Sequence, residues 1–296
     1  MMTPAGPLAA QSSAWDAETM APDPVDGRST VYAPNGMVAT SQPLASEAAL
    51  RILRQGGNAF DAAVAASAVL SLVEPHMTNV GGDLFALAWS ADEGRMIGLD
   101  ASGRAGSLMT PENIREDGFD DVPYRGAGSV TVPGAVAGWE ALVREHGNLS
   151  LAEVLEPAIE LAEGGFPVSP IIARQWGNLV GVLEDDEGAS ATYLMDGEAP
   201  EAGEWFRNPD LARTLRMIAG GGADAFYRGD FGARLADGIR ELGGYITPDD
   251  MAAMEVEWVE PLSVDYRGWT IWELPPAGQG IAALQMFELL EPFDLA

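Results

Sequence analysis

The stretch from Gly56 to Trp89 constrains the fold of this chain more than any other. A pair of glycines ends one helix, and Asn58 then begins another. Residues 59–73 carry small or apolar side chains on nearly every face, which is typical of a helix that is buried on most sides. Pro75 cannot continue that helix, and an apolar strand is expected at residues 84–89 after a glycine turn. The stretch therefore predicts a buried helix, a tight turn and a strand in that order.

In the rest of the chain, segments whose apolar residues have the spacing of a helix alternate with segments that have the spacing of a strand. Strands are expected at residues 36–40, 84–90, 96–101, 261–266 and 269–273, with 84–90 and 96–101 forming a hairpin. Helices are expected at residues 45–55, 135–145, 169–183, 209–219, 229–242 and 279–290, and after the caps Thr110, Ser150 and Thr247. Residues 184–208 are acidic and contain glycine and proline, which indicates an irregular surface loop. This alternation favours a layered α/β fold.

Residues 1–34 combine Pro, Ala, Asp and Ser without periodicity, and we expect a poorly ordered N-terminal extension there. Residues 35–296 form the folded domain, for which 47% hydrophobic residues are ample. The N-terminal segment shows neither the basic start nor the apolar run of a signal peptide, which favours a cytoplasmic protein. No apolar stretch reaches the roughly 18 residues that span a membrane.

The charge balance is unusual, because 45 acidic residues face 16 basic ones, for a net charge of −29, and every basic residue is arginine. Such a chain repels nucleic acid and anionic membrane surfaces, so neither is an expected partner. An ordinary acidic surface explains this composition, and adaptation to high salt is the sharper hypothesis. The chain contains no cysteine and only two histidines, His76 and His146, so we expect neither a disulfide nor a metal site.

Several motifs follow each other in a fixed order: GNAFDAAVAA at residues 57–66, VEPHM at 73–77, SVTVPGAVAGW at 129–139, GADAFYRG at 222–229 and LPPAGQGI at 274–281. Together they resemble the gamma-glutamyltranspeptidase family, a group of N-terminal-nucleophile hydrolases. The resemblance implies an α/β fold, the four-layer αββα sandwich of such hydrolases, of which residues 35–296 would supply the large-subunit portion.

The resemblance also implies an autoprocessing precursor. Members of the family cleave themselves before a threonine, which becomes the nucleophile for gamma-glutamyl transfer or for hydrolysis of glutathione. That threonine begins a Thr-Thr-His or Thr-Ser-His run, and neither histidine of this chain follows two hydroxyl residues. We therefore expect no catalytic residue within this chain, no cofactor, and a small subunit from the same precursor as partner. The chain alone is expected to be inactive.

One substrate-binding group of the family is expected inside the chain, namely an arginine that holds the substrate α-carboxylate. The family pattern Asp-Phe-Arg-Glu-Thr-Ala-Pro corresponds to Asp100-Ala101-Ser102-Gly103-Arg104-Ala105-Gly106, so Ser102 occupies the arginine position and Arg104 follows two residues later. An extended backbone would keep both side chains on one face, so that Arg104 replaces the family arginine. The alternative is a surface arginine paired with one of the many acids. This departure puts the acyl donor in question.

Other candidates are more easily read as structural. The pair Gly81-Gly82 favours a tight turn over an anion site, and His76 favours a hydrogen-bonded core position over a catalytic base. Asp185-Asp186-Glu187 lacks the ligand spacing of a calcium loop, and Gly220-Gly221-Gly222 lacks the context of a nucleotide site. Two other functions stay open: a truncated, non-catalytic partner of a separate small subunit, supported if residues 279–295 expose apolar surface, and a carboxylate-binding protein that reuses the fold.

Overall fold

A computed structural model describes residues 30–294 of the chain. The chain divides into two compact units, Met1–Met37 and Val38–Ala296, and the second contains every helix and strand described below. The extension expected at residues 1–34 falls almost entirely outside the described residues.

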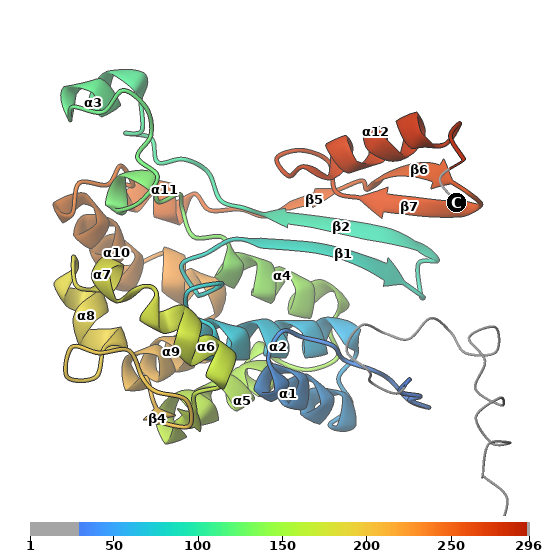
Figure 1. Cartoon of the computed structure of the whole chain (residues 1–296), viewed down its shortest axis with the longest axis horizontal. Coiled ribbons are helices and arrows are strands. Elements are labelled where there is room, and N and C mark those ends of the chain that lie inside the picture. The colour runs from blue at the N-terminus through green and yellow to red at the C-terminus, as the bar shows by residue number, and fades with distance from the viewer. Residues whose placement is uncertain (1–29, 295–296) are drawn as a thin grey trace, which may run out of the picture. The chain divides into compact units, whose positions relative to one another are not determined.

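Five helices pack together in the second unit (Figure 1). They are α1 (Pro43–Arg54), α2 (Ala59–Val73), α4 (Ala135–His146), α5 (Leu151–Gly164) and α9 (Pro209–Tyr227). α2 contacts α1, α4 and α5, and most of its residues are buried, which confirms the helix predicted from small and apolar side chains. Asn58 and Asp61 form a capping box at its start.

A three-stranded antiparallel sheet lies on α4. Its order is β1 (Leu84–Ser90), β2 (Arg95–Ala101) and β5 (Glu257–Val259). One face packs on α4, where a Cβ at Gly138 would lie 2.9 Å from a side-chain carbon of Leu84 and 3.1 Å from that of Ala101. The absence of a side chain at Gly138 therefore lets the helix approach the hairpin closely. Figure 1 shows β1 and β2 running above α4.

The opposite face of the sheet is partly open in the described residues, although the Leu274 side chain covers it at Gly98. Phe85, Leu87 and Trp89 alternate along β1 on this face, with exposed fractions of 46%, 38% and 61%. Asp100 and Glu257 share it, because Phe85 pairs with Asp100 and Asp100 pairs with Glu257. An apolar strand face of this kind normally lies against another layer.

A second hairpin and a helix end the described chain. β6 (Leu262–Tyr266) and β7 (Trp269–Glu273) pair in the predicted way and carry α12 (Gly280–Leu290). The Tyr266 and Phe287 rings lie 5.0 Å apart at this contact. Leu284 is the only buried residue of α12. The helix thus exposes apolar side chains, namely Ile281, Met286, Leu289 and Leu290, with Phe293 after them.

The remaining elements are α3 (Pro111–Glu116), a short 3-10 helix (Ala127–Ser129), β3 (Phe166–Pro167), α6 (Pro170–Gly177), α7 (Val180–Leu183), α8 (Glu187–Tyr193), β4 (Trp205–Phe206), α10 (Asp230–Glu241) and α11 (Pro248–Ala252). Thr110, Ser150 and Thr247 accept the predicted cap hydrogen bonds. In the described part of the chain no helix is long and apolar enough to cross a membrane.

Three segment predictions are wrong. Residues 36–40 form no strand, because no described strand pairs with them and the Thr40 hydroxyl instead bonds to the start of α1, at Gln42 and Ser46. The helix predicted at residues 169–183 breaks after Gly177 into α6 and α7.

The third error concerns residues 184–208, which are not simply an irregular loop. Asp186 caps α8, and β4 pairs with β3. The segment also places Tyr193 and Phe206 against Trp176, with ring centroids 5.9 Å and 4.9 Å from it. The acidic composition concealed these aromatic anchors.

Candidate functional site

Ser102 and Arg104 lie on the loop that leaves β2. Gly103 between them has φ +75°, so the backbone is not extended there and the two side chains do not simply share a face. A Cβ at Gly103 would lie 1.8 Å from the carbonyl oxygen of Val132, and the Val132 N–H donates to the carbonyl oxygen of Arg104 at 2.9 Å. Only glycine fits this contact, which fixes the backbone of Arg104 against the segment before α4.

The Arg104 side chain lines a cavity and also pairs with an acid. The cavity has a volume of about 240 Å³ and is lined by Arg104, Ala105, Ser107, Val132, Asp250, Ala253, Met254 and Glu255. The guanidinium is 86% exposed, and its Nη2 donates to Oε1 of Glu257 at 2.9 Å. Arg104 thus has both features that the sequence analysis offered as alternatives: it borders a cavity, as a ligand-binding residue would, and it is a surface arginine paired with an acid.

Ser102 is not among the residues that line this cavity. Its backbone N–H donates to Oδ1 of Asp100 at 2.8 Å, directly after the last residue of β2. The structure therefore separates the two predicted substrate-binding residues, and Arg104 is the one beside open space.

Carboxylates surround Arg104. Glu257 and Asp100 are neighbours across β5 and β2, and Asp250 and Glu255 line the cavity. The pKa of Asp83 is raised from its ordinary value, first by partial loss of solvent and second by the charge of Asp100. The single arginine thus lies in a predominantly negative environment.

Asp250 also holds the cavity wall in place. Its Oδ2 accepts hydrogen bonds from the backbone N–H and hydroxyl of both Ser107 and Thr247, at 2.7 to 3.0 Å. Desolvation raises the pKa of Asp250, but these hydrogen bonds outweigh it and the net pKa is lowered. The carboxylate therefore stays ionised and joins the Arg104 loop to α11.

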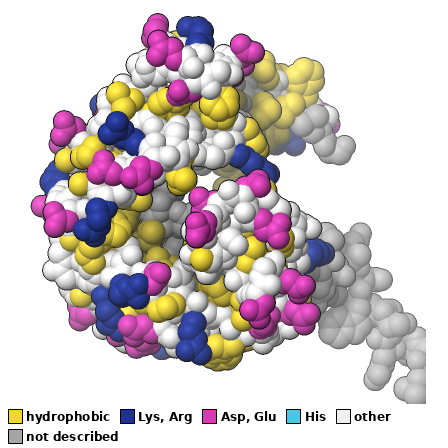
Figure 2. Space-filling model, turned by 90° about the vertical axis from the view of Figure 1, so that its left-hand side faces the viewer, with side chains coloured by type: hydrophobic (Ala, Val, Ile, Leu, Met, Phe, Trp, Pro, Cys, Tyr) yellow, Lys and Arg dark blue, Asp and Glu magenta, His cyan; other side chains and the backbone are white. Residues whose placement is uncertain are grey.

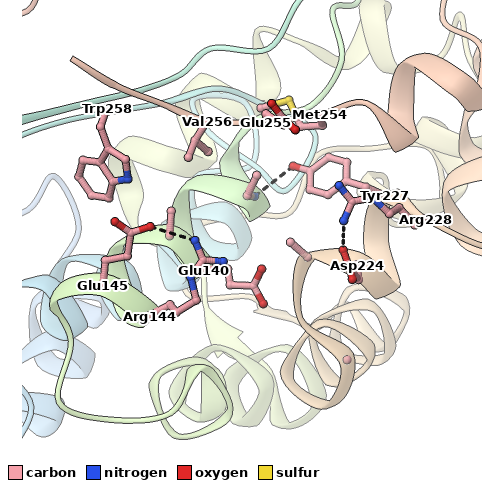
Figure 3. A pocket seen from close by; sticks show the side chains of 14 residues that line it. Glu140, Arg144, Glu145, Asp224, Tyr227, Arg228, Met254, Glu255, Val256 and Trp258 are labelled. Atoms are coloured by element: carbon pink, nitrogen blue, oxygen red, sulfur yellow. Dashed lines mark hydrogen bonds and ion pairs between the residues drawn. The ribbon is translucent and has the colours of Figure 1, made fainter.

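A larger cavity of about 590 Å³ lies between α4, the end of α9 and the approach to β5 (Figure 3). Its two arginines are already paired, Arg144 with Glu145 and Arg228 with Asp224. Trp258 lines it from the face of the sheet opposite to Glu257. Pairing does not separate the two cavities, because Arg104 is also paired with an acid. The smaller cavity is the better candidate site because the arginine expected from the sequence motif lines it.

The structure shows a hydrogen-bonded turn at Gly81-Gly82 and a half-buried, hydrogen-bonded position for His76. The N–H groups of Gly81 and Gly82 bond to the Asn79 side chain and carbonyl, at 2.8 and 3.0 Å, which confirms a tight turn. Nε2 of His76 lies 3.0 Å from Oε1 of Gln175, and the buried Nδ1 has no hydrogen-bond partner. Among residues 30–294 no group of three or more His, Asp or Glu side chains is arranged to hold a metal ion.

Sequence reasoning missed Glu257. It lies 153 positions after Arg104, and only the pairing of β5 with β2 brings the two together. No local motif identifies such a contact. The negative charge of Glu257 could not identify it as the partner of Arg104, because the chain has many acidic residues. Figure 2 shows acidic side chains scattered over the visible face, with arginines among them.

Comparison with known proteins places this geometry in a family. The sequence model of the gamma-glutamyltranspeptidase family matches residues 45–296. The glutathione hydrolase-like YwrD proenzyme of Bacillus subtilis is 42% identical over 259 residues, which cover 87% of this chain and 49% of that protein. The oxamate amidohydrolase proenzyme of Klebsiella pneumoniae is 40% identical over 268 residues, covering 88% of this chain and 50% of that protein.

The solved structures agree. The crystal structure of cephalosporin acylase from Bacillus halodurans matches with a TM-score of 0.87 at 42% identity, covering 90% of this chain and 51% of that one. This chain spans about half the length of the curated relatives it matches. The collinear motifs, the family match and the shared α/β structure lead to one conclusion: the chain belongs to the gamma-glutamyltranspeptidase family of hydrolases and acyltransferases.

Proposed function

We propose that the complete protein is an N-terminal-nucleophile acyltransferase or hydrolase that cleaves a gamma-glutamyl amide of the glutathione type. A threonine in the part of the precursor outside this chain attacks the amide carbonyl. The amine leaves with a proton, and water or a second amine then resolves the acyl-enzyme ester. The proenzyme names of the relatives and the family match support this reaction class.

Arg104 carries the proposal for this chain. Its guanidinium borders the 240 Å³ cavity and is held by a single acid, Glu257, so donors remain free for a ligand. A guanidinium can hold a carboxylate through two parallel hydrogen bonds. We assign Arg104 the binding of the donor α-carboxylate, and Ser102 a supporting position on the same loop.

The proposed partner is the small subunit from the same precursor. Its strands would cover the open face of the sheet, where Phe85, Leu87 and Trp89 are exposed, and would complete an αββα sandwich. Residues 35–296 then form the large-subunit portion. The exposed apolar side of α12 is further surface for such a partner. Because the nucleophile lies outside this chain, residues 1–296 alone would be inactive.

The test uses the longest natural reading frame that contains this chain, produced in high salt. Intact mass should show two fragments, one beginning with threonine, and the protein should release p-nitroaniline from its gamma-glutamyl derivative. Arg104→Ala should lower kcat/KM about 10- to 100-fold by removing a charged hydrogen-bonding partner of the substrate. Arg213→Ala is the matched control, because Arg213 is also exposed and paired with an acid, on α9.

Two results would contradict the proposal. A single unprocessed species without anilide release would favour the non-catalytic partner or the carboxylate-binding protein. Equal activity of Arg104→Ala and Arg213→Ala would remove Arg104 from substrate binding while leaving the reaction class intact.

A further inference from the structure

The 590 Å³ cavity beside α4 has an excess of negative charge and takes no part in the proposed reaction. Its charged lining residues are Glu140, Arg144, Glu145, Asp224, Arg228 and Glu255. The two arginines each pair with one of the four acids, Arg144 with Glu145 and Arg228 with Asp224. Glu140 and Glu255 are left over, and neither forms an ion pair within residues 30–294. The lining therefore carries two uncompensated negative charges and favours a cation.

Glu140 is placed for a ligand by a glycine close to it. Gly222 has φ +66°, which interrupts α9, and a Cβ at this position would clash with Oε1 of Glu140. Only glycine leaves room for the carboxylate there. Figure 3 shows Glu140 between the two ion pairs, and its carboxylate accepts no hydrogen bond from residues 30–294. A half-buried carboxylate without a partner is a favourable contact for an ammonium group.

Two aromatic side chains complete the walls of the cavity. Trp258 is 37% exposed, and its ring packs edge-on against the His146 ring, with centroids 5.1 Å apart. The face of an indole attracts a cation electrostatically. Tyr227 is buried, and its oxygen accepts one hydrogen bond, from the N–H of Ala137 at 3.1 Å. Loss of solvent raises the pKa of Tyr227, and the charge of Glu140 adds to this, so the hydroxyl stays neutral. One acceptor site of that hydroxyl is left for a ligand.

Other classes of ligand fit this cavity less well. The excess negative charge repels an anion. Among residues 30–294 no group of three or more His, Asp or Glu side chains is arranged to hold a metal ion, which disfavours a bare divalent cation. The volume is that of pockets that hold small organic molecules. The apolar lining can contact a methylene chain and consists of Ala137, Ala141, Ala223, Met254, Val256 and Trp258.

We propose that this cavity is a binding site for an organic dication of the diamine or polyamine class. One ammonium group binds Glu140, Glu255 balances the second, and the methylene chain lies along Trp258. Although Glu255 lines both cavities, Glu140, Tyr227 and Trp258 do not line the one beside Arg104, so the two cavities present different chemistry. The binding is non-covalent and does not depend on the proposed reaction.

Calorimetry on the protein from the full reading frame, in 0.15 M NaCl, tests this with 1,4-diaminobutane as the probe. The wild type should bind it saturably, and should not bind 1,4-butanediol, which has the same chain without charges. Glu140→Gln should weaken binding about tenfold by removing the ammonium partner, and Trp258→Leu about fivefold by removing the aromatic face. Glu241→Gln is the matched control, because Glu241 is an exposed glutamate of α10 that does not line this cavity. It removes the same charge and should leave binding unchanged.

Diffuse attraction of cations to an acidic surface predicts different results. If Glu241→Gln weakens binding as much as Glu140→Gln, or if Mg²⁺ at the same charge concentration displaces the diamine, the cavity is no specific site and the inference is overturned. Absence of saturable binding to the wild type overturns it as well. Anilide release is measured on the same samples. A protein that binds the diamine in this pattern without anilide release supports the inference, and only the proposed reaction fails.

Discussion

The buried carboxylate of Asp61 on α2 accepts a hydrogen bond from the backbone N–H of Asn148 at 2.9 Å, across the loop between α4 and α5. The same carboxylate accepts the N–H of Asn58 at 2.9 Å, and Asp61 is 0% exposed. One side chain thus caps its own helix and anchors a second loop, which joins α2 to both neighbouring helices.

Replacing Asp61 should therefore weaken the whole helical layer. Asp61→Ala removes the acceptor of the N–H groups of Asn58 and Asn148, which are at most partly buried, so the free energy of unfolding should fall by roughly 1–3 kcal/mol. Urea unfolding measures this change. Asp92→Ala, in the exposed turn between β1 and β2, is the control and should change stability by less than about 0.5 kcal/mol. Similar losses in both variants would contradict the anchoring role.

Two glycines with similar backbone angles should respond differently to alanine. Gly103 has φ +75° and Gly94 has φ +65°, but a Cβ meets the Val132 oxygen at Gly103 and nothing within 4 Å at Gly94. Gly94→Ala should cost about 1 kcal/mol for the left-handed backbone alone. Gly103→Ala should cost roughly 2 kcal/mol more, because the backbone must shift. Equal unfolding midpoints for the two variants would show that the close approach at Gly103 does not exist.

The open sheet face predicts a solubility and assembly phenotype. Leu87→Lys with Trp89→Lys should reduce self-association of residues 1–296, measured by light scattering, because both side chains are exposed and apolar. In the full reading frame the same pair should prevent subunit assembly and processing, since two charges would be buried. Leu242→Lys, exposed by 67% at the end of α10, should do neither. Normal processing of the double variant would exclude this face as the subunit contact.

The net charge of −29 predicts stabilisation by salt. The Debye length falls from about 10 Å at 0.1 M to about 3 Å at 1 M, so repulsion among surface carboxylates is largely screened. We expect the free energy of unfolding to rise by roughly 2–3 kcal/mol from low salt to 2 M NaCl, or about 5–10 °C in Tm. Sucrose at matched osmolality should give a smaller gain. A flat response to salt would contradict adaptation to high salt.

Two ion pairs between helices predict a stability difference that depends on pH. Hydrogen bonds from Arg51 lower the pKa of Glu160 from 4.5, and those from Arg216 lower the pKa of Glu163 from 4.5. A carboxyl whose pKa is lower in the folded chain stabilises the fold above its unfolded pKa, and this contribution disappears as the pH falls through the folded pKa.

The double variant Arg51→Gln with Arg216→Gln should therefore be less stable than wild type at pH 7, and the difference should shrink below pH 4.5. Urea midpoints at pH 7, 5, 4 and 3 measure it. Arg213→Gln, which removes a pair within α9, is the control and should differ little at any pH. A difference that persists to pH 3 would contradict the linkage.

Local chemistry made part of this fold predictable. The Asn58 cap, the Ser150 capping box and the turn between β1 and β2 each depend on residues within a few positions of one another. Burial of α2 followed from its composition. These features need no knowledge of the rest of the chain.

Long-range contacts set the limit of sequence reasoning. The loop carrying Arg104 was located by motif, but the bend at Gly103 depends on Val132, and the partner Glu257 depends on β5. Likewise, Phe206 is buried because it packs against Trp176 of α6. The acidic composition of residues 184–208 gives no indication of this contact. The spacing of apolar residues predicts whether one segment is a helix or a strand, but it does not predict which other segment that helix or strand contacts.

The three-residue pairing of β5 with β2 also has a consequence for synthesis of the chain. Arg104 is made early, but Glu257 can join it only after the intervening helices have been synthesised, because Gly98 to Asp100 must wait for residues 257–259. Contacts between residues so distant in sequence form late, since a long loop must close before they are gained. The charged pair at the candidate site is thus one of the last native contacts that a growing chain can make, because it needs a residue 153 positions after Arg104.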